Sequence, residues 1–178
     1  VLLGGALLDN VRLFEDVRQM AISDPLTGLA NYRRLVDALE GEIQRFRRTG
    51  RPFSLLLLDL DGLKKVNDSY GHLVGSQALR RVASVLRVNS RSIDTAARYG
   101  GDEFALILPE TGMNAAQEVA RRICGRVAKD GELPPISVSV GVAVSAQDGE
   151  TIETLLGAAD QALYKAKGRA RRKLSIAV

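Results

Sequence analysis

The stretch that decides the fold of this chain reads Arg98-Tyr99-Gly100-Gly101-Asp102-Glu103-Phe104. It joins two apolar segments, Thr95–Arg98 and Phe104–Leu108, which both have the composition of strands, so it predicts a hairpin. The glycines at its tip can take positive φ angles and let a bulky ligand approach the main chain. The adjacent carboxylates are hard oxygen ligands of the kind that Mg²⁺ accepts when it also binds phosphates. A plain hairpin with a charged tip would explain the same four residues, so the rest of the chain has to decide between the two.

Composition narrows the class of protein. The 178 residues fit one domain with an appendage, and a hydrophobic content of 46% is enough for a core. The net charge of +4 with only 4% aromatic residues favours a phosphate-handling surface over a nucleic-acid groove, because no aromatic side chains are interleaved with the Lys and Arg residues. The single Cys124 excludes an internal disulfide and suits a reducing cytosol, so we expect a cytoplasmic protein.

The N-terminal 22 residues form a segment of their own. Apolar residues recur at alternating spacings of four and three with one polar member, which predicts a coiled-coil lead from an upstream region. An amphipathic helix packed on its own domain is the alternative. No apolar run is long enough to span a membrane, no signal peptide is visible, and the chain begins with Val1, so we expect a piece of a longer protein. The members of the seam are Leu3, Leu7, Asn10, Phe14, Val17 and Ala21.

Residues 23–178 read as one domain of mixed elements. The pattern predicts helices at 31–49, 77–88, 114–129 and 151–167, with a loop or short helix between the first strand and the second helix. It predicts strands at 53–58, 95–98, 104–108, 136–144 and 174–178. This mixture, with at least one hairpin, predicts an α/β layer fold with helices over a mostly antiparallel sheet.

Acidic residues gather where the first strand ends. Asp59 closes the apolar run Leu55–Leu58, and Asp61 follows nominally on the same face. A strand-end Asp59 and a hairpin-tip Asp102 form a minimal two-carboxylate clamp for Mg²⁺, whose open positions would go to phosphate oxygens. Backbone N–H groups after the strand and the charge of Lys64 would suit a triphosphate.

Six motifs in register resemble the GGDEF family of bacterial dinucleotide cyclases. The match runs from about Ser23 to Arg172, in the order and spacing of the family, and a lone glycine-glycine-acidic hairpin would not be as specific. The motifs are Asp24 to Asn31, Asp59-Leu60-Asp61 with Lys64 to Asp68, Gly71-His72, Tyr99 to Phe104, Ser139-Val140-Gly141, and Ala162 to Lys167.

The resemblance implies a palm-like nucleotidyl cyclase fold with a central five-stranded sheet flanked by helices. It implies that each subunit of a homodimer holds one nucleoside triphosphate, and that each 3′-hydroxyl attacks the α-phosphate of the other with release of pyrophosphate. Asp59, the carbonyl of Leu60 and Asp102 would hold Mg²⁺ or Mn²⁺. Asp102, Glu103 and Lys64 would be catalytic, and the choice of general base between the two acids stays open.

The resemblance also places the substrate. Two departures from the family pattern fall in the tail, where Ala170 replaces a glycine and Arg172 an asparagine, which weakens the assignment of Arg171 over Arg169. The residues implied to bind substrate are Gly62, Leu63, Lys64, Asn67, Ser76, Arg98, Lys167 and Arg171.

A third departure concerns the base. The family usually has a Gly-Asp pair where this chain has Gly75-Ser76, and that aspartate reads the edge of guanine together with the residue at Asn67. The Ser76 hydroxyl is both donor and acceptor and can satisfy guanine or adenine. We therefore expect GTP and ATP as substrates and cyclic GMP-AMP as the favoured product, with cyclic di-GMP as a side product. The alternatives are a strict diguanylate cyclase and a degenerate domain that only binds GTP or a cyclic dinucleotide.

Arg91-Ser92-Ile93-Asp94 precedes the hairpin at the spacing of the family's inhibitory product site. The resemblance implies that Arg91, Asp94 and Arg122 bind the cyclic dinucleotide there. A surface ion pair is the alternative reading of Arg91 and Asp94.

Overall fold

The computed structural model describes residues 22–175 of the chain, and the side chains among them as far as Gly168. Apart from Ile22, the predicted coiled-coil lead lies outside the described residues. The elements are α2 (Tyr32–Thr49), β1 (Ser54–Leu60), α3 (Leu63–Tyr70), α4 (His72–Asn89), β2 (Thr95–Arg98), β3 (Glu103–Leu108), α5 (Met113–Ala128), β4 (Val138–Val144), α6 (Ser145–Asp148) and α7 (Ile152–Ser175).

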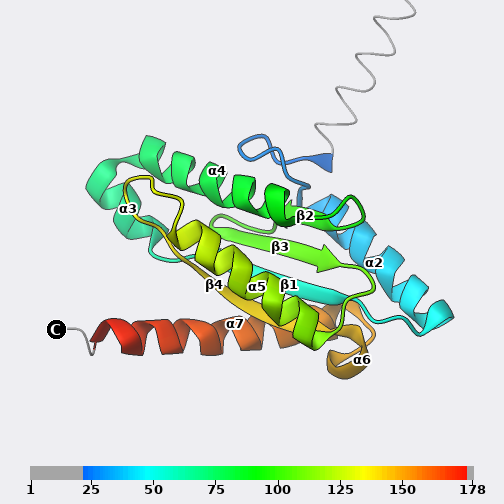
Figure 1. The fold of residues 1–178 in the computed structure, drawn as a ribbon. Coiled ribbons are helices and arrows are strands. Elements are labelled where there is room, and N and C mark those ends of the chain that lie inside the picture. The colour runs from blue at the N-terminus through cyan, green and yellow to red at the C-terminus, as the bar shows by residue number, and fades with distance from the viewer. Residues whose placement is uncertain (1–21, 176–178) are drawn as a thin grey trace, which may run out of the picture.

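An antiparallel sheet of four strands forms the middle of the domain, in the order β2-β3-β1-β4 (Figure 1). The predicted apolar run in β1 explains its central place, because every residue of that strand is buried. β1 pairs with β3 from Ser54 opposite Leu108 to Asp59 opposite Glu103. The predicted strand end and the hairpin tip therefore meet at one end of the sheet.

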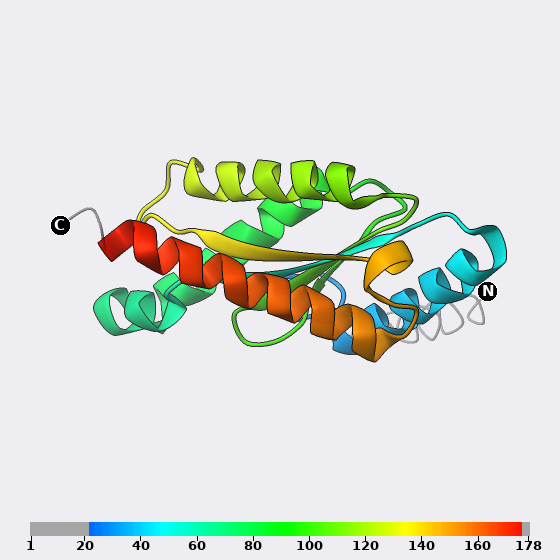
Figure 2. The same cartoon turned by 90° about the horizontal axis from the view of Figure 1, so that it is seen from below.

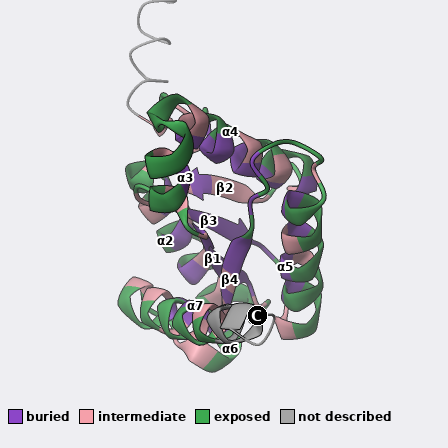
Figure 3. Cartoon of the chain, turned by 90° about the vertical axis from the view of Figure 1, so that its left-hand side faces the viewer, coloured by how far each residue is buried: buried purple, intermediate pink, exposed green. Residues whose placement is uncertain are grey.

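Helices cover both faces of the sheet, α4 and α5 on one side and α2 and α7 on the other (Figures 2 and 3). Side chains of a strand alternate between the faces, so Leu56 and Leu58 pack with α4 and α5 while Leu55 and Leu57 pack with α2 and α7. Asp59 has the same parity as Leu57. Its carboxylate therefore emerges on the α7 side of the sheet.

The predicted fifth strand is wrong over the part that the structure describes. Leu174 and Ser175 belong to α7, and residues 176–178 lie outside the described range. The residues after Gly168 are mostly Ala, Arg, Lys and Leu, which are strong helix formers, and one glycine costs only about 1 kcal/mol inside a helix. The sheet thus has four strands within residues 22–175 instead of five.

The remaining elements follow the predicted order with shifted ends. The short segment after β1 is helical as α3, and the next helix begins earlier than predicted, at His72. Asn31 caps α2 as expected, because its side chain accepts a hydrogen bond from the backbone N–H of Arg34. No helix among residues 22–175 has the length and apolar character needed to cross a lipid bilayer.

Candidate functional site

The end of β1 presents a buried carboxylate that carries an ion pair. Asp59 is 7% exposed, and the Nζ of Lys167 on α7 lies 2.7 Å from its Oδ2. Burial raises the pKa of Asp59, and the charges of Asp102 and Asp61 add to the rise, whereas Lys167 opposes it. The predicted metal residue is thus neutralised by a predicted substrate residue.

Glu103 of β3 lies directly opposite Asp59 of β1 in the strand pairing, so the two carboxylates share one environment. Burial raises the pKa of Glu103, and the charges of Asp59 and Asp102 raise it further. Three carboxylates at one end of the sheet therefore repel one another. Such a cluster favours the approach of a cation.

The glycines of the hairpin tip differ from the prediction. Neither Gly100 nor Gly101 has a positive φ. A Cβ at Gly100 would lie 2.7 Å from Oε2 of Glu103, whereas a Cβ at Gly101 would meet nothing within 4 Å. The Glu103 carboxylate thus occupies the space that a side chain at position 100 would need. Gly101 leaves open space beside Asp102.

Arg98 holds the hairpin tip by hydrogen bonds. Its Nε and Nη2 donate to the carbonyls of Gly100 and Gly101 at 3.1 and 2.7 Å, and its Nη1 donates to Oδ2 of Asp24 at 3.2 Å. Burial tends to raise the pKa of Asp24, but hydrogen bonds from Thr27 and the charge of Arg98 outweigh it and hold the pKa below its usual range. Arg98 thus ties the tip to the Asp24–Asn31 motif, and its predicted contact with substrate stays a prediction.

A cavity of about 590 Å³ lies between the hairpin tip and helices α3 and α4. It brings together most of the predicted substrate residues, with Asp102 at the same wall. Six lining residues were not predicted as site residues, although Leu79 follows Ser76 at helical spacing; they are Leu26, Asp68, His72, Gly75, Leu79 and Gly101. The lining residues are Leu26, Leu63, Lys64, Asn67, Asp68, His72, Gly75, Ser76, Leu79, Arg98, Gly101 and Asp102.

The start of α3 offers this cavity a site for anions. Gly62 caps the helix with a φ of 69° and has no side chain there, and the first helical bond runs from the N–H of Val66 to the carbonyl of Gly62. The N–H groups of the preceding residues Leu63, Lys64 and Lys65 have no partner within the helix, which makes the helix start attractive to phosphate. The ammonium of Lys64 adds a charge at the same place.

Gly75 makes room for a predicted base-reading side chain. It lies in the first turns of α4, and a Cβ there would overlap Oδ1 of Asn67 and lie 2.9 Å from its Cγ. Any larger residue at position 75 would displace the Asn67 amide. The glycine therefore fixes where Asn67 lies in the cavity wall.

Glu103 opens into a different cavity from Asp102. This cavity, of about 290 Å³, lies against α7 and is lined by Glu103, Asp160, Gln161, Leu163, Tyr164, Lys165 and Lys167. The two adjacent acids of the hairpin therefore face opposite sides. Neither this division nor the presence of Asp160 in the same cavity as Lys167 was predicted from the sequence.

The carboxylates have the oxygen donors of a Mg²⁺ site, but the side chains as placed do not surround one. Within residues 22–175, no three His, Cys, Asp or Glu side chains form a group that could hold a metal ion. Lys167 takes one oxygen of Asp59. A divalent cation that displaced Lys167 would relieve the repulsion that raises the pKa values of Asp59 and Glu103, so the residues fit the ion chemically.

Arg91 and Asp94 form a bidentate pair away from these cavities. Nε and Nη2 of Arg91 donate to Asp94, and Nη2 also donates to the carbonyl of Pro109 and the hydroxyl of Thr111. Arg122 donates to Oδ1 of Asn89 at 3.0 Å. The Arg91 side chain is about half exposed, at 53%.

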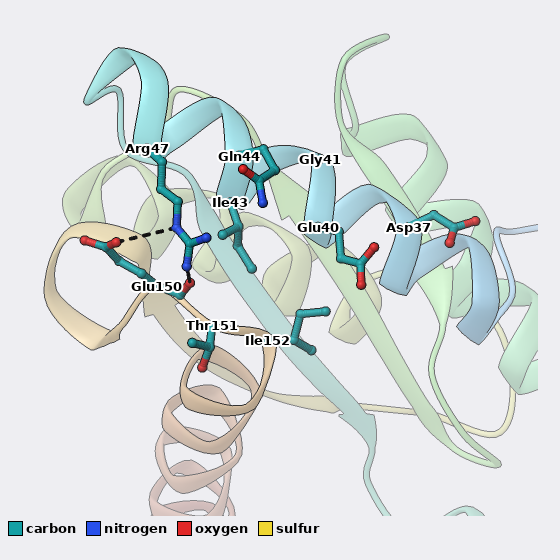
Figure 4. Close-up of a pocket in the computed structure, with 9 residues that line it drawn as sticks. All are labelled: Asp37, Glu40, Gly41, Ile43, Gln44, Arg47, Glu150, Thr151 and Ile152. Atoms are coloured by element: carbon teal, nitrogen blue, oxygen red, sulfur yellow. Dashed lines mark hydrogen bonds and ion pairs between the residues drawn. The ribbon is translucent and has the colours of Figure 1, made fainter.

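Another hollow, of about 580 Å³, lies between α2 and the start of α7 (Figure 4). Asp37 and Glu40 make its rim acidic, and Arg47 is bound by the carbonyl and the carboxylate of Glu150. It contains none of the predicted site residues. An acidic rim does not suit a triphosphate, so we assign it no role in the chemistry.

Comparison with known proteins agrees with this geometry. The family model described as "Diguanylate cyclase, GGDEF domain" matches residues 21–173. The chain belongs to the GGDEF domain family. The resemblance inferred from the six motifs is thereby confirmed.

Named relatives of this GGDEF domain are bacterial. It is 40% identical over 169 residues to the diguanylate cyclase DgcP of Pseudomonas aeruginosa, and 39% identical over 160 residues to the response regulator PleD of Caulobacter vibrioides. These matches cover 92% and 86% of this chain but only 25% and 35% of the relatives, so the chain spans about a quarter to a third of their length.

Among solved structures, the coiled coil and GGDEF domain of DgcB from Caulobacter crescentus in complex with c-di-GMP is similar with a TM-score of 0.82 and 32% identity. That match covers 92% of this chain and 90% of the DgcB chain. DgcP is named a diguanylate cyclase and the DgcB structure contains a GGDEF domain with c-di-GMP, and none of these relatives supports the expected cyclic GMP-AMP product.

Proposed function

We propose that this GGDEF domain condenses two molecules of GTP into cyclic di-GMP with release of two pyrophosphates. The observation that carries the proposal is the 590 Å³ cavity, which is lined by the polar side chains of Asn67 and Ser76, by Lys64 at the start of α3, and by Asp102 of the hairpin. The kinship with diguanylate cyclases supports GTP as the substrate. It favours the strict alternative of the sequence analysis over the mixed product.

In this proposal one GTP lies along the cavity from α4 to the start of α3. Asn67 and Ser76 bind the edge of the base, while Gly62, Leu63 and Lys64 receive the β- and γ-phosphates. Lys167, and Arg171 beyond the described side chains, add positive charge for the triphosphate. Each group thus has one part of the nucleotide to bind.

Asp59, the Leu60 carbonyl and Asp102 would hold Mg²⁺ or Mn²⁺, which supplies charge neutralisation at the triphosphate. With such an ion held by Asp59, Lys167 would be released from its ion pair and would be available to phosphate. The 3′-oxygen of one GTP forms a bond to the α-phosphorus of the other, and the bond from that phosphorus to the bridging oxygen breaks as pyrophosphate leaves. The hydroxyl proton passes to one of the two acids, Asp102 or Glu103.

Two domains must face each other, because each cavity holds one nucleotide and each nucleotide needs a 3′-hydroxyl from the other. A homodimer is therefore part of the proposal. The heptad seam with Leu7, Phe14 and Val17 would promote it, and it lies outside the described residues.

The test is to incubate the protein with GTP, with ATP and with both, in Mg²⁺ or Mn²⁺, and to identify the products by mass. We expect cyclic di-GMP from GTP alone and no product from Asp59→Asn or Asp102→Asn. Binding of GTP or cyclic dinucleotide without any turnover would make the domain a receptor and refute the proposal. Near-normal turnover in either variant would refute the two-carboxylate site.

Ser76 gives one reason to test a second product. It lines the cavity where the family usually has an aspartate, and a neutral hydroxyl does not penalise adenine. The same incubation with both nucleotides measures cyclic GMP-AMP directly. If Ser76 sets the choice, Ser76→Asp will shift the product ratio towards cyclic di-GMP by roughly tenfold, the effect of about 1.4 kcal/mol.

We further propose that the product binds at Arg91, Asp94 and Arg122 and lowers turnover. The half-exposed side chain of Arg91 supports this, as does the c-di-GMP named with the similar DgcB structure. Arg91→Ala should relieve inhibition by added product without changing the uninhibited rate. Equal inhibition of the variant and the parent would refute a regulatory role.

A further inference from the structure

Both carboxylate oxygens of Asp61 accept hydrogen bonds, one from Ser139 of β4 and one from Ser137 just before that strand. The hydroxyl of Ser137 donates to Oδ2 at 2.7 Å, and that of Ser139, a buried residue, donates to Oδ1 at 2.8 Å. The backbone N–H of Asp61 also donates to the carbonyl of Ser137 at 2.9 Å. Three bonds thus fix one residue that lines none of the cavities described above.

The clamp holds a turn that carries much of the proposed site. On the other side of the same turn, the N–H of Leu60 donates to the carbonyl of Asp102 at 2.9 Å. The turn is therefore fixed to β4 through Asp61 and to the hairpin tip through Leu60. Asp59 precedes it and Gly62, the start of α3, follows it directly.

We propose that Asp61 is a positioning residue that acts through Ser137 and Ser139. By fixing the turn, it sets the direction of the Asp59 carboxylate and the Leu60 carbonyl towards a divalent cation, and the direction of the α3 start towards phosphate. This inference rests on the proposed function for the identity of the ligands. It also gives the serines around the Ser139-Val140-Gly141 motif a role.

A direct metal ligand at Asp61 is the competing explanation, and the two differ in what the serines do. If Asp61 positions the turn, removing both hydroxyls should harm the site as much as removing the carboxylate. Asparagine should largely substitute, because its oxygen accepts from one serine and its amide donates to the other, whose hydroxyl can rotate. If Asp61 binds the ion itself, asparagine should fail and the serines should matter little.

The experiment measures Mn²⁺ binding in the presence of 3′-deoxy-GTP, which lacks the attacking hydroxyl and cannot react. Free Mn²⁺ is followed by its EPR signal, and kcat and KM for GTP are measured beside it. The variants are Asp61→Ala, Asp61→Asn, the double variant S137A/S139A and the triple variant. Ser145→Ala is the matched control, since Ser145 is buried just beyond the far end of β4 and its hydroxyl accepts from Phe53.

Loss of an outer residue that orients a metal ligand typically weakens metal binding by about 10- to 100-fold. We expect at least about a tenfold higher Mn²⁺ Kd for Asp61→Ala and for S137A/S139A, with no further loss in the triple variant. Asp61→Asn and Ser145→Ala should stay near the parent. Thermal unfolding without metal checks that each variant folds.

A parent-like Mn²⁺ Kd in Asp61→Ala or in S137A/S139A would overturn the inference, and so would an Asp61→Asn as damaged as Asp61→Ala. A parent protein that makes no cyclic dinucleotide refutes the proposed function instead. The Mn²⁺ titration then still decides whether the clamp positions the turn.

Discussion

Replacing Gly75 by alanine should weaken GTP binding without weakening the fold. The added Cβ would overlap Oδ1 of Asn67 and approach Cδ1 of Leu63 to 3.2 Å. The overlapped atom is the end of a side chain that can rotate, so Asn67 will turn away and the helix will stay. The substitution therefore removes the proposed contact between Asn67 and the base indirectly, by displacing the Asn67 side chain.

The magnitudes separate binding from stability. Alanine is favoured over glycine inside a helix by up to about 1 kcal/mol, which offsets the cost of moving Asn67, so the free energy of unfolding should change by no more than about 1 kcal/mol. A hydrogen bond whose loss leaves a polar group unpaired is worth about 1–3 kcal/mol. Since 1.4 kcal/mol is a factor of ten, the Kd of 3′-deoxy-GTP should rise about tenfold.

The assay is a titration of 3′-deoxy-GTP beside denaturant unfolding, for Gly75→Ala, Asn67→Ala and the double variant. Gly41→Ala in α2 is the control, because a Cβ there meets nothing within 4 Å. If Gly75 acts through Asn67, the double variant will bind as Asn67→Ala does. A Kd within twofold of the parent, or additive losses in the double variant, would refute the reasoning.

Other predictions concern packing, pH and assembly. Gly141→Ala should lower the free energy of unfolding by about 3 kcal/mol in a denaturant titration, because the added Cβ would overlap the backbone of α7 at Ala159 and Leu163. Gly157→Ala is the control and should not lower it, since a Cβ at position 157 meets nothing within 4 Å. Arg81 donates hydrogen bonds to Asp130 and lowers the pKa of that carboxyl below 3.8. The ionised pair therefore stabilises the fold above pH 3.8, and this stabilisation is lost as the pH falls through the lowered pKa. Asp130→Asn should therefore be less stable than the parent by about 1–2 kcal/mol near pH 7, and the difference should shrink below pH 3.8 when unfolding is measured across pH. Turnover per domain should rise with protein concentration until dimers saturate, and a flat specific activity well below the dimer Kd would contradict the shared site.

The sequence was most informative where one physical rule dominated. A run of four leucines before Asp59 can only be a buried strand in this context, and β1 is buried throughout. Asn31 before an amphipathic pattern predicted the start of α2 correctly. Helix ends and the tail were less certain, because residues 169–175 suit a helix by propensity while residues 174–178 also alternate like a strand.

The sequence predicted which residues belong to the site, but not which of them contact one another. The family resemblance grouped Lys64, Asn67 and Ser76 at one substrate site, and the cavity brings the three together. Spacing could not reveal that Lys167 reaches Asp59 across the domain, since that contact depends on α7 packing directly on Gly141. Nor could it tell that Gly100 serves the Glu103 carboxylate instead of a positive φ.

The hairpin tip acts as a partition between two cavities, and this explains why it carries two acids. Asp102 faces the cavity with Lys64 and Asn67, while Glu103 faces the smaller cavity with Lys167 on α7. A single carboxylate could serve only one of these spaces, and here Asp102 lies in the hairpin tip while Glu103 is the first residue of β3. In a reaction that joins two nucleotides, the acid beside the bound triphosphate and the acid on the far side of the strand then have different neighbours. Asp102 precedes β3 and Glu103 begins it, so the two acids are divided at the start of the strand, and the ion pair of Lys167 with Asp59 lies on the α7 side with Glu103.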